Sequence, residues 1–191
     1  MLQIFCPDTR YSSPSRTARV PVDNRVGEEN DGWRVTNVTL RFERGTAFAQ
    51  HIITLRSQVR HLVSLARSRR TATGTAWDEP ELRRKVGRLD ASVEALWRMT
   101  QMGIAEAEHT GAPAPSGSAI KLRYSELSQE LADLALRVAG RTVIGAGGPD
   151  DETTELVREY LWSLQFTIAA GTSQIQRNLI AERILGMPKG R

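Results

Sequence analysis

Apolar residues recur at helical spacing from about residue 35 to residue 185, and this periodicity limits the fold more than any other feature of the sequence. Successive apolar positions lie three, four or seven to eight residues apart, which keeps them on one face of an α-helix. The expected helices cover residues 36–68, 79–108, 118–139, 152–169 and 173–185. Short polar or Gly- and Pro-rich breaks separate them, so the pattern predicts an all-α fold, an antiparallel bundle of four to five helices.

The residues at the expected helix ends support this division. Asp78, Glu79 and Pro80 offer an N-cap candidate and a first-turn proline for the second helix. Thr172 or Ser173 is the N-cap candidate for the last helix, which we expect to stop before Gly186 and Pro188. The apolar face expected on the helix at 152–169 consists of Leu156, Tyr160, Leu161, Leu164 and Ile168.

Residues 1–33 differ from the rest of the chain. They contain three prolines and few periodic apolar positions. The segment Arg19-Val-Pro-Val22 is compatible with an edge strand, where proline is tolerated, and residues 24–32 have the composition of a turn and loop. We therefore expect two regions, an irregular segment at 1–33 and a helical bundle domain at 34–191.

Composition excludes several classes of protein. The chain has 191 residues, 40% hydrophobic and 25% charged, with a mean hydropathy of -0.37, which is ordinary for a soluble globular protein. No apolar run approaches the ~18–20 residues that span a bilayer. Cys6 is the only cysteine, so an intrachain disulfide is impossible and a cytoplasmic setting is favoured. His51, His61 and His109 lack acidic or cysteine partners at metal-ligand spacing, so we expect no metal site.

The charge pattern leaves two readings open. The formal net charge is +4, and 26 basic residues are interleaved with 22 acidic ones. The densest basic group consists of Arg67, Arg69, Arg70, Arg83, Arg84, Lys85 and Arg88. A solvated end of a helix hairpin explains this group more simply than a nucleic-acid patch does, so we expect no nucleic-acid partner.

Two stretches carry a more specific signal. One is Ala170-Gly-Thr-Ser-Gln-Ile-Gln-Arg-Asn178, followed by Ala181-Glu-Arg-Ile-Leu-Gly-Met-Pro188. The other is Arg19-Val-Pro21 with Val26-Gly-Glu-Glu-Asn-Asp-Gly-Trp33, followed by Leu40 and by Phe42-Glu43-Arg44. These stretches resemble the acyl-CoA dehydrogenase family. There, the first opens the last helix, and the second leads from the middle β-domain into the C-terminal helical domain. The resemblance covers about residues 19–191.

The resemblance implies an activity and a set of site residues. The implied activity is FAD-dependent α,β-desaturation of an acyl-CoA thioester, in lipid or fatty acid metabolism. Many family members carry the catalytic glutamate directly before Gly-Thr-Ser, where this chain has Ala170. Others carry it before an arginine on an earlier helix, which matches Glu43 as the base and Arg44 as the residue beside the substrate. Gly171, Thr172, Ser173 and Gln174 match the segment that contacts FAD.

Each of these assignments has a plainer alternative. Glu43 is also compatible with a glutamate in the N-terminal turn of a helix, where it merely suits the helix dipole. The Thr172 segment is also compatible with simple N-capping. The family's Arg-x-x-Phe-Gly and Gln-x-x-Gly-Gly segments, which reach a neighbouring subunit's FAD, have no match near residues 67–74 and 137–148.

The length of the family also shapes the expectations. Members are roughly twice as long, so we expect a truncated or fragmentary chain in which residues 1–33 are the remnant of the β-domain. Expected partners are an acyl-CoA, a homo- or hetero-oligomer and an electron-accepting flavoprotein, with no membrane span. Whether the chain is itself an enzyme stays open. The alternative is a non-catalytic helical subunit or remnant that packs on a partner chain.

Overall fold

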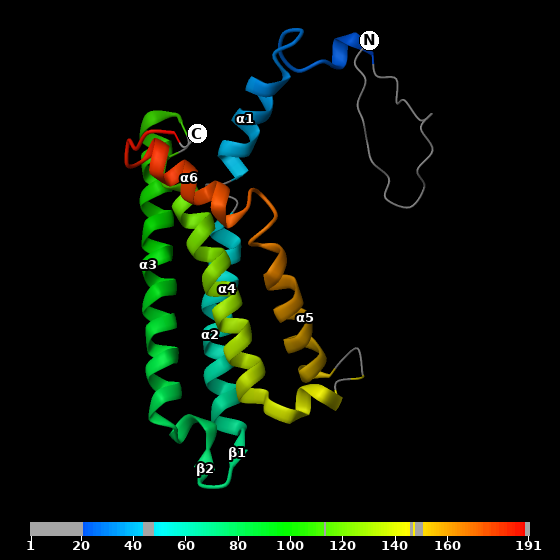
Figure 1. The fold of residues 1–191 in the computed structure, drawn as a ribbon, viewed down its shortest axis with the longest axis vertical. Helices are drawn as coiled ribbons and strands as arrows, with labels where there is room; N and C mark the ends of the chain where they lie inside the picture. Colours follow the sequence, from blue (N-terminus) through cyan, green and yellow to red (C-terminus); the bar gives the residue numbers. More distant parts are fainter. Residues whose placement is uncertain (1–20, 44–47, 113, 146, 148–150, 190–191) are drawn as a thin grey trace. The chain divides into compact units, whose positions relative to one another are not determined.

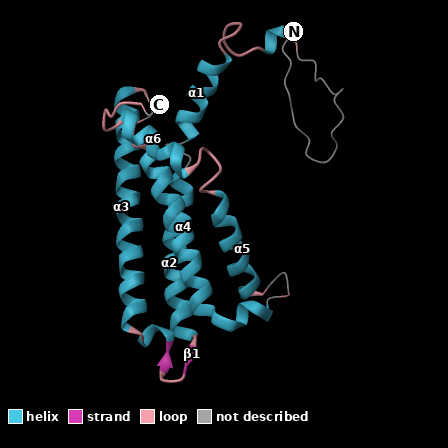
Figure 2. Cartoon of the chain, in the orientation of Figure 1, coloured by secondary structure: helices cyan, strands magenta, loops and turns pink. Residues whose placement is uncertain are grey.

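The computed structural model describes residues 21–43, 48–112, 114–145, 147 and 151–189, without the side chains of residues 39–43. Apart from one small pair of strands, all regular structure in these residues is helical (Figure 1, Figure 2). The expected all-α class is therefore confirmed. The chain divides into two compact units, residues 1–39 and 40–191. The sequence-based boundary between residues 33 and 34 stays a prediction.

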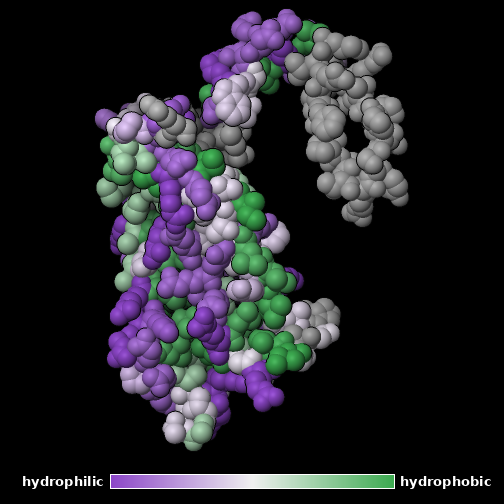
Figure 3. All heavy atoms as spheres, in the orientation of Figure 1, coloured by the Kyte–Doolittle hydropathy of each residue, from purple (hydrophilic) through white to green (hydrophobic). Residues whose placement is uncertain are grey.

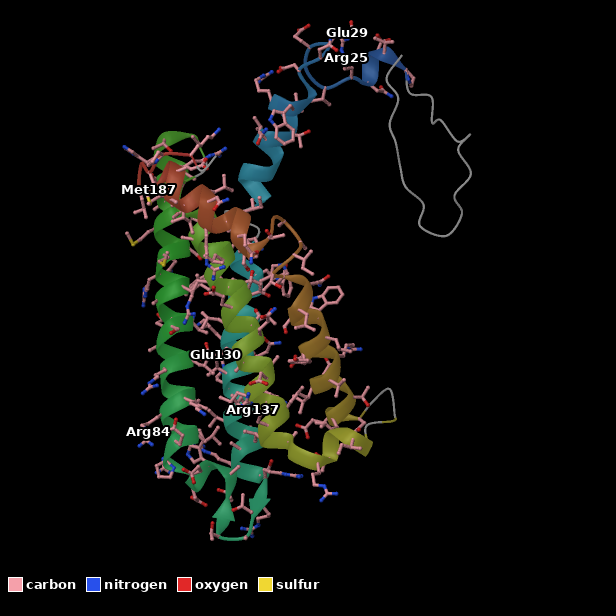
Figure 4. All side chains as sticks on the ribbon, viewed as in Figure 1. Arg25, Glu29, Arg84, Glu130, Arg137 and Met187 are labelled. Atoms are coloured by element: carbon pink, nitrogen blue, oxygen red, sulfur yellow. The ribbon has the colours of Figure 1, made fainter. Side chains whose placement is uncertain are left out.

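The described part of the first unit holds a 3-10 helix, η1 (Val22–Asn24), and most of α1 (Gly32–Glu43). The expected edge strand at 19–22 is wrong at Val22, which lies in η1, while Arg19 and Val20 lie outside the described residues. The cause is a turn, because the Pro21 carbonyl accepts the Asn24 N–H at 3.1 Å. Arg25 and Glu29 form an exposed ion pair at 3.7 Å (Figure 4).

Three long helices build the core of the second unit: α2 (Phe48–Ser68), α3 (Pro80–Thr110) and α4 (Gly117–Ala139). Successive helices run in opposite directions, as an antiparallel bundle requires (Figure 1). α4 packs against α2, α3, α5 (Glu152–Gln165) and α6 (Ser173–Arg183), so it is the central helix. The largest of the fully buried apolar side chains are Ile52, Leu55, Leu62, Leu89, Val93, Leu96, Ile120 and Leu127.

The connection between α2 and α3 contains structure that the sequence did not predict. β1 (Arg70–Thr71) and β2 (Gly74–Thr75) pair antiparallel, and a 3-10 helix, η2 (Ala76–Asp78), follows. The Asp78 carboxylate accepts the Thr75 N–H at 2.7 Å, and this bond holds the pKa of Asp78 below its usual range. Glu79 is therefore the N-cap of α3, with Pro80 as its first residue.

Other element bounds refine the sequence-based ones. The structure describes helices on both sides of residues 44–47, so the expected continuity of one helix over 36–68 lies outside the described residues there. η3 (Gly140–Gly145) follows α4 directly. α5 ends at Gln165 rather than at residue 169, and α6 lies across the end of the bundle opposite β1 and β2 (Figure 1).

The apolar face expected on α5 is only partly buried. Leu156 is 3% exposed, but Leu161 is 60% exposed and Leu164 is 40% exposed. Trp162 and Ile168 are also exposed, and apolar surface gathers over α5 (Figure 3). Leu161, Leu164 and Ile168 therefore belong to the expected apolar pattern but are not buried by the described residues. None of the described helices is both long and apolar enough to cross a membrane.

We expect Leu127→Ala to lower the free energy of unfolding by about 2–5 kcal/mol, because the side chain is fully buried on the central helix and its loss leaves a cavity. Leu161→Ala is the matched control on α5, where the side chain is 60% exposed, and we expect a change within about 0.5 kcal/mol. Urea denaturation measures both. Equal losses for the two variants would contradict the assigned core.

Candidate functional site

The segment from the end of α5 to the first turn of α6 is held in an unusual backbone conformation. We call residues 166–172 the α5–α6 turn. Ala170 has a φ of 54° and Gly171 has a φ of 93°, both in the left-handed region. This region suits glycine but costs an alanine roughly 1–2 kcal/mol. The conformation of Ala170 therefore persists because surrounding contacts fix it, and such strain is typical of functional sites.

The side chain of Gln176 supplies one of these contacts from α6. It is fully buried, and its Nε2 donates to the Ala170 carbonyl at 2.8 Å. A Cβ on Gly171 would lie 2.7 Å from this nitrogen. Gly171 is thus required both by its φ and by the close approach of Gln176. The Oε1 atom of Gln176 is buried and has no hydrogen-bond partner among the described residues.

Three polar side chains on one face of α4 also contact the α5–α6 turn. We call these residues, Lys121, Ser125 and Gln129, the α4 polar stripe. The Lys121 ammonium donates to the Phe166 carbonyl at 2.7 Å and to the Gly171 carbonyl at 2.6 Å. The Ser125 hydroxyl lies 2.9 Å from the Phe166 carbonyl, and Gln129 Nε2 lies 3.3 Å from Thr167 Oγ1. Carbonyls left free where α5 ends therefore receive donors from α4.

The start of α6 is capped and partly open. Thr172 Oγ1 accepts the Ile175 N–H at 3.3 Å, so the N-capping predicted for Thr172 is confirmed. The Ser173 N–H donates to the Thr167 carbonyl at 3.1 Å. Among the described residues, the Gln174 N–H has no acceptor, and the Gln174 side chain is exposed. Free N–H groups at a helix N-terminus attract phosphates and other anions.

An ion pair docks α6 onto α4 beside this segment. Arg177 Nη2 lies 2.6 Å from Glu126 Oε1, and Arg123 Nη1 lies 3.6 Å from Glu126 Oε2. The basic side chain of the Gln-Ile-Gln-Arg segment is therefore turned toward α4. Gln176 and Arg177, the last two residues of this segment, therefore both have structural contacts.

The predicted site residues fall into two groups. Gly171, Thr172, Ser173 and Gln174 lie together, at the junction of the α5–α6 turn and α6. Glu43 is the last residue of α1, so a position in the first turn of a helix is wrong. Its side chain, and all of Arg44, lie outside the described residues, and their roles stay predictions. Sequence reasoning missed Lys121, because nothing in the pattern distinguishes this lysine from an exposed one.

A groove elsewhere in the bundle also collects polar and aromatic side chains. A groove between α2, α4 and α5 is lined by His51, Tyr124 and Trp162 among others, and burial raises the pKa of Tyr124. Gln58 and Glu159, which both line it, form a hydrogen bond at 2.9 Å, and the lining residue His61 lies 3.5 Å from Glu152. Within the part of the chain that is described, no group of three or more His, Cys, Asp or Glu side chains is arranged to hold a metal ion.

Several members of the basic group at the hairpin end have partners within the bundle. Arg84 Nη2 lies 2.6 Å from Glu81 Oε2, and the Arg67 guanidinium lies 5.5 Å from the centre of the Trp77 ring. On α4, Arg137 pairs with Asp133 at 2.8 Å; Arg84 and Arg137 are labelled in Figure 4. These contacts fit the solvated hairpin end that the sequence favours.

Comparison with known proteins adds a family to this geometry. The family model for the C-terminal domain of acyl-CoA dehydrogenases matches residues 30–185. Acyl-CoA dehydrogenase IpdE1 of Mycobacterium tuberculosis is 37% identical over 173 residues, which cover 90% of this chain and 42% of that protein. The chain thus spans less than half the length of this curated relative.

Solved structures share the fold. The crystal structure of the ChsE4–ChsE5 complex from Mycobacterium tuberculosis matches with a TM-score of 0.69 and 28% identity, over 90% of this chain and 44% of that chain. The prolyl acyl carrier protein oxidase AnaB matches with a TM-score of 0.74 and 25% identity, over 88% of this chain and 43% of that chain.

We expect Ala170→Gly to raise the free energy of unfolding by about 1 kcal/mol, because glycine removes the cost of a left-handed φ at an exposed position. Ala95→Gly is the matched control. Ala95 is exposed in the interior of α3, where glycine lowers the free energy of unfolding by about 1 kcal/mol. Thermal denaturation gives both values, and a loss of equal size at the two positions would contradict the strained turn.

Proposed function

Because the chain belongs to the acyl-CoA dehydrogenase family, whose C-terminal domain its residues 30–185 match, we propose that it serves in the FAD-dependent α,β-desaturation of an acyl-CoA thioester. The observation that carries the proposal is the α5–α6 turn, held from two sides next to a helix start at which Gln174 is exposed and Ser173 half-buried. These residues cover 42% of the length of IpdE1, so the rest of the catalytic site comes from further chain or from a partner.

The start of α6 fits a flavin dinucleotide. The unbonded Gln174 N–H and the Thr172 and Ser173 hydroxyls can bond the phosphate, ribityl or ring-edge acceptors of FAD. Bound FAD supplies the acceptor for the hydride that leaves the β-carbon of the substrate. In this proposal Gly171, Thr172, Ser173 and Gln174 hold the cofactor, while Thr172 also caps the helix.

The base in this proposal is Glu43. Its carboxylate takes the proton from the α-carbon, and the remaining C–H electron pair forms the Cα=Cβ double bond as the β-hydrogen departs. A carboxylate suits this step when a dry pocket raises its pKa toward that of the substrate. Ala170 has no ionisable atom and leaves the other family position for the base empty. Arg44 lies beside the thioester in the same proposal. Residues 1–33 correspond to the end of the family's β-domain.

The partners follow from the same proposal. An acyl-CoA is the substrate, and an electron-accepting flavoprotein removes the electrons. An oligomer of like or unlike chains supplies the missing enclosure of the flavin. The exposed apolar face of α5 and the two differently named chains of the ChsE4–ChsE5 complex both support assembly with a second chain.

A second candidate function is a non-catalytic helical subunit. Ala170, at the position where many relatives carry the glutamate, favours it, as does the exposed face of α5. In this case the chain packs on a partner and holds no flavin of its own. Flavin absorbance of the purified protein discriminates between the two candidates.

We expect the 191-residue polypeptide alone to turn over little or no acyl-CoA, because hydride transfer needs the reacting atoms held about 3–3.5 Å apart and the β-domain that encloses the flavin ring lies outside these residues. The assay uses FAD, a series of acyl-CoA chain lengths and an artificial electron acceptor. Steady turnover by this polypeptide without a partner would show that the residues already form a whole site.

With the remaining domains or partner supplied, we expect Glu43→Gln to lower kcat about 10²–10⁴-fold, because glutamine keeps the shape but cannot take a proton. Ala170→Gly should leave the rate within a few-fold. Glu28→Gln, an exposed glutamate in the N-terminal unit, is the matched control. Near-wild-type turnover by Glu43→Gln would remove Glu43 as the base.

A partial rescue gives a further readout. In Glu43→Gln combined with Ala170→Glu, the carboxylate moves to the position that other family members use, and we expect some of the lost rate to return.

A further inference from the structure

The ammonium of Lys121 is buried under the α5–α6 turn without a carboxylate. The residue is 1% exposed, and no ion pair of the described residues includes it. Its Nζ is shared between two backbone carbonyls, those of Phe166 and Gly171. A cation in such a place is costly unless its hydrogens are bonded, so an apolar residue of similar length would be the simpler way to fill the space.

We propose that Lys121 is a positioning residue, whose ammonium joins the two ends of the α5–α6 turn and thereby orients the start of α6 for FAD. The positioning of the turn by Lys121 is inferred from this chain alone. That the positioned turn binds FAD rests on the proposed function. Lys121 touches neither substrate nor cofactor in this role. It acts through the carbonyls that it holds.

The two hydrogen bonds of Lys121 differ in how much their acceptors depend on them. The Phe166 carbonyl also lies 2.9 Å from the Ser125 hydroxyl, whose single hydrogen can turn either to it or to the Lys121 carbonyl at 2.8 Å, so a second donor stays within reach when Lys121 is replaced. The Gly171 carbonyl has no other donor among the described residues. Loss of the ammonium should therefore free the Gly171 end of the turn more than the Phe166 end. This asymmetry separates a specific role of the ammonium from general loosening.

The surroundings explain how the charge is tolerated. Phe166 is the C-cap residue of α5, and a helix C-terminus carries a partial negative charge that favours a cation. Burial lowers the pKa of Lys121, as expected for an ammonium that is not neutralised by an acid. Two short bonds and a helix terminus thus replace the usual ion pair.

The test compares two side chains of nearly equal shape at position 121. In a Cys6→Ser background, Lys121→Cys is alkylated in denaturant and refolded. Bromoethylamine forms a C–S bond with loss of bromide and restores the ammonium, while bromopropane gives an uncharged chain of the same length. Lys121→Met is the genetic counterpart of the uncharged chain. Leu89→Ala, a buried truncation on α3, controls for general loss of stability.

Two readouts report the turn. Amide hydrogen exchange of Ser173, whose N–H bonds the Thr167 carbonyl, reports the Gly171 end, and that of Ile168, bonded to the Gln165 carbonyl, reports the Phe166 end. With the uncharged chain, we expect Ser173 to exchange at least about tenfold faster while Ile168 changes less, since a bond to a charged donor is worth about 1.5–3 kcal/mol. FAD affinity, from a fluorescence titration, should fall about tenfold or more. The aminoethyl chain should restore both.

Several outcomes would overturn the proposal. Wild-type exchange of Ser173 with the uncharged chain would show that Lys121 only fills space. Equal acceleration of Ser173 by Leu89→Ala would assign the effect to stability. Unchanged FAD affinity with accelerated exchange would remove the role toward the cofactor. If the unmodified chain binds no FAD, the proposed flavin site fails in this chain, and the exchange rates alone decide whether Lys121 positions the turn.

Discussion

A buried cation that bonds backbone carbonyls is the interaction on which this end of the bundle depends. Where α5 stops, its last carbonyls lose their helical partners, and the α4 polar stripe places polar groups there: Lys121 and Ser125 at the Phe166 carbonyl, and Gln129 at the Ser163 carbonyl and the Thr167 hydroxyl. The residues of the stripe lie four positions apart, so one face of the central helix meets the whole end of α5. Because α4 also packs against α2 and α3, the α5–α6 turn is bonded to a helix that belongs to the core. These contacts offset the conformational cost of the left-handed φ at Ala170.

The Gly-Thr-Ser-Gln-Ile-Gln-Arg segment separates into residues that build the turn and residues that remain free. Gly171 meets a steric and conformational demand, and Thr172 caps α6. Gln176 and Arg177 fasten the segment to the turn and to α4. Ser173 is half-buried and its N–H bonds the Thr167 carbonyl, whereas Gln174 is exposed and its N–H has no acceptor among the described residues. Most of the segment therefore builds a particular backbone shape. In the proposed function, residues 171–174 both build this shape and meet the cofactor.

Much of the fold could be predicted from the sequence because helical periodicity and helix ends are local properties. The starts of α3, α5 and α6 follow from residues such as Pro80 and Thr172, which act on their own neighbours. Lys121 could not be predicted, since its burial depends on carbonyls 45 and 50 residues away in the chain. The exposure of Leu161 does not follow from its sequence position, because periodicity shows which face of a helix is apolar but not what covers that face. The strand expected at Val22 failed because one proline carbonyl closed a turn.

The proposed chemistry places different demands on the two parts of the site. A base that removes the α-proton and a helix start that holds the cofactor must face neighbouring carbons of one substrate, with reacting atoms about 3–3.5 Å apart. The α5–α6 turn is fixed to α4 by side chains from two helices, so it cannot move to meet the substrate without breaking bonds to buried carbonyls. Glu43, in contrast, ends a helix that is shared between the two compact units of the chain. In the proposed function Glu43 is the base, because Ala170 has no ionisable atom at the other position that family members use. The proposal therefore requires a carboxylate from α1 and a cofactor held by the α5–α6 turn, two groups that come from segments far apart in the sequence.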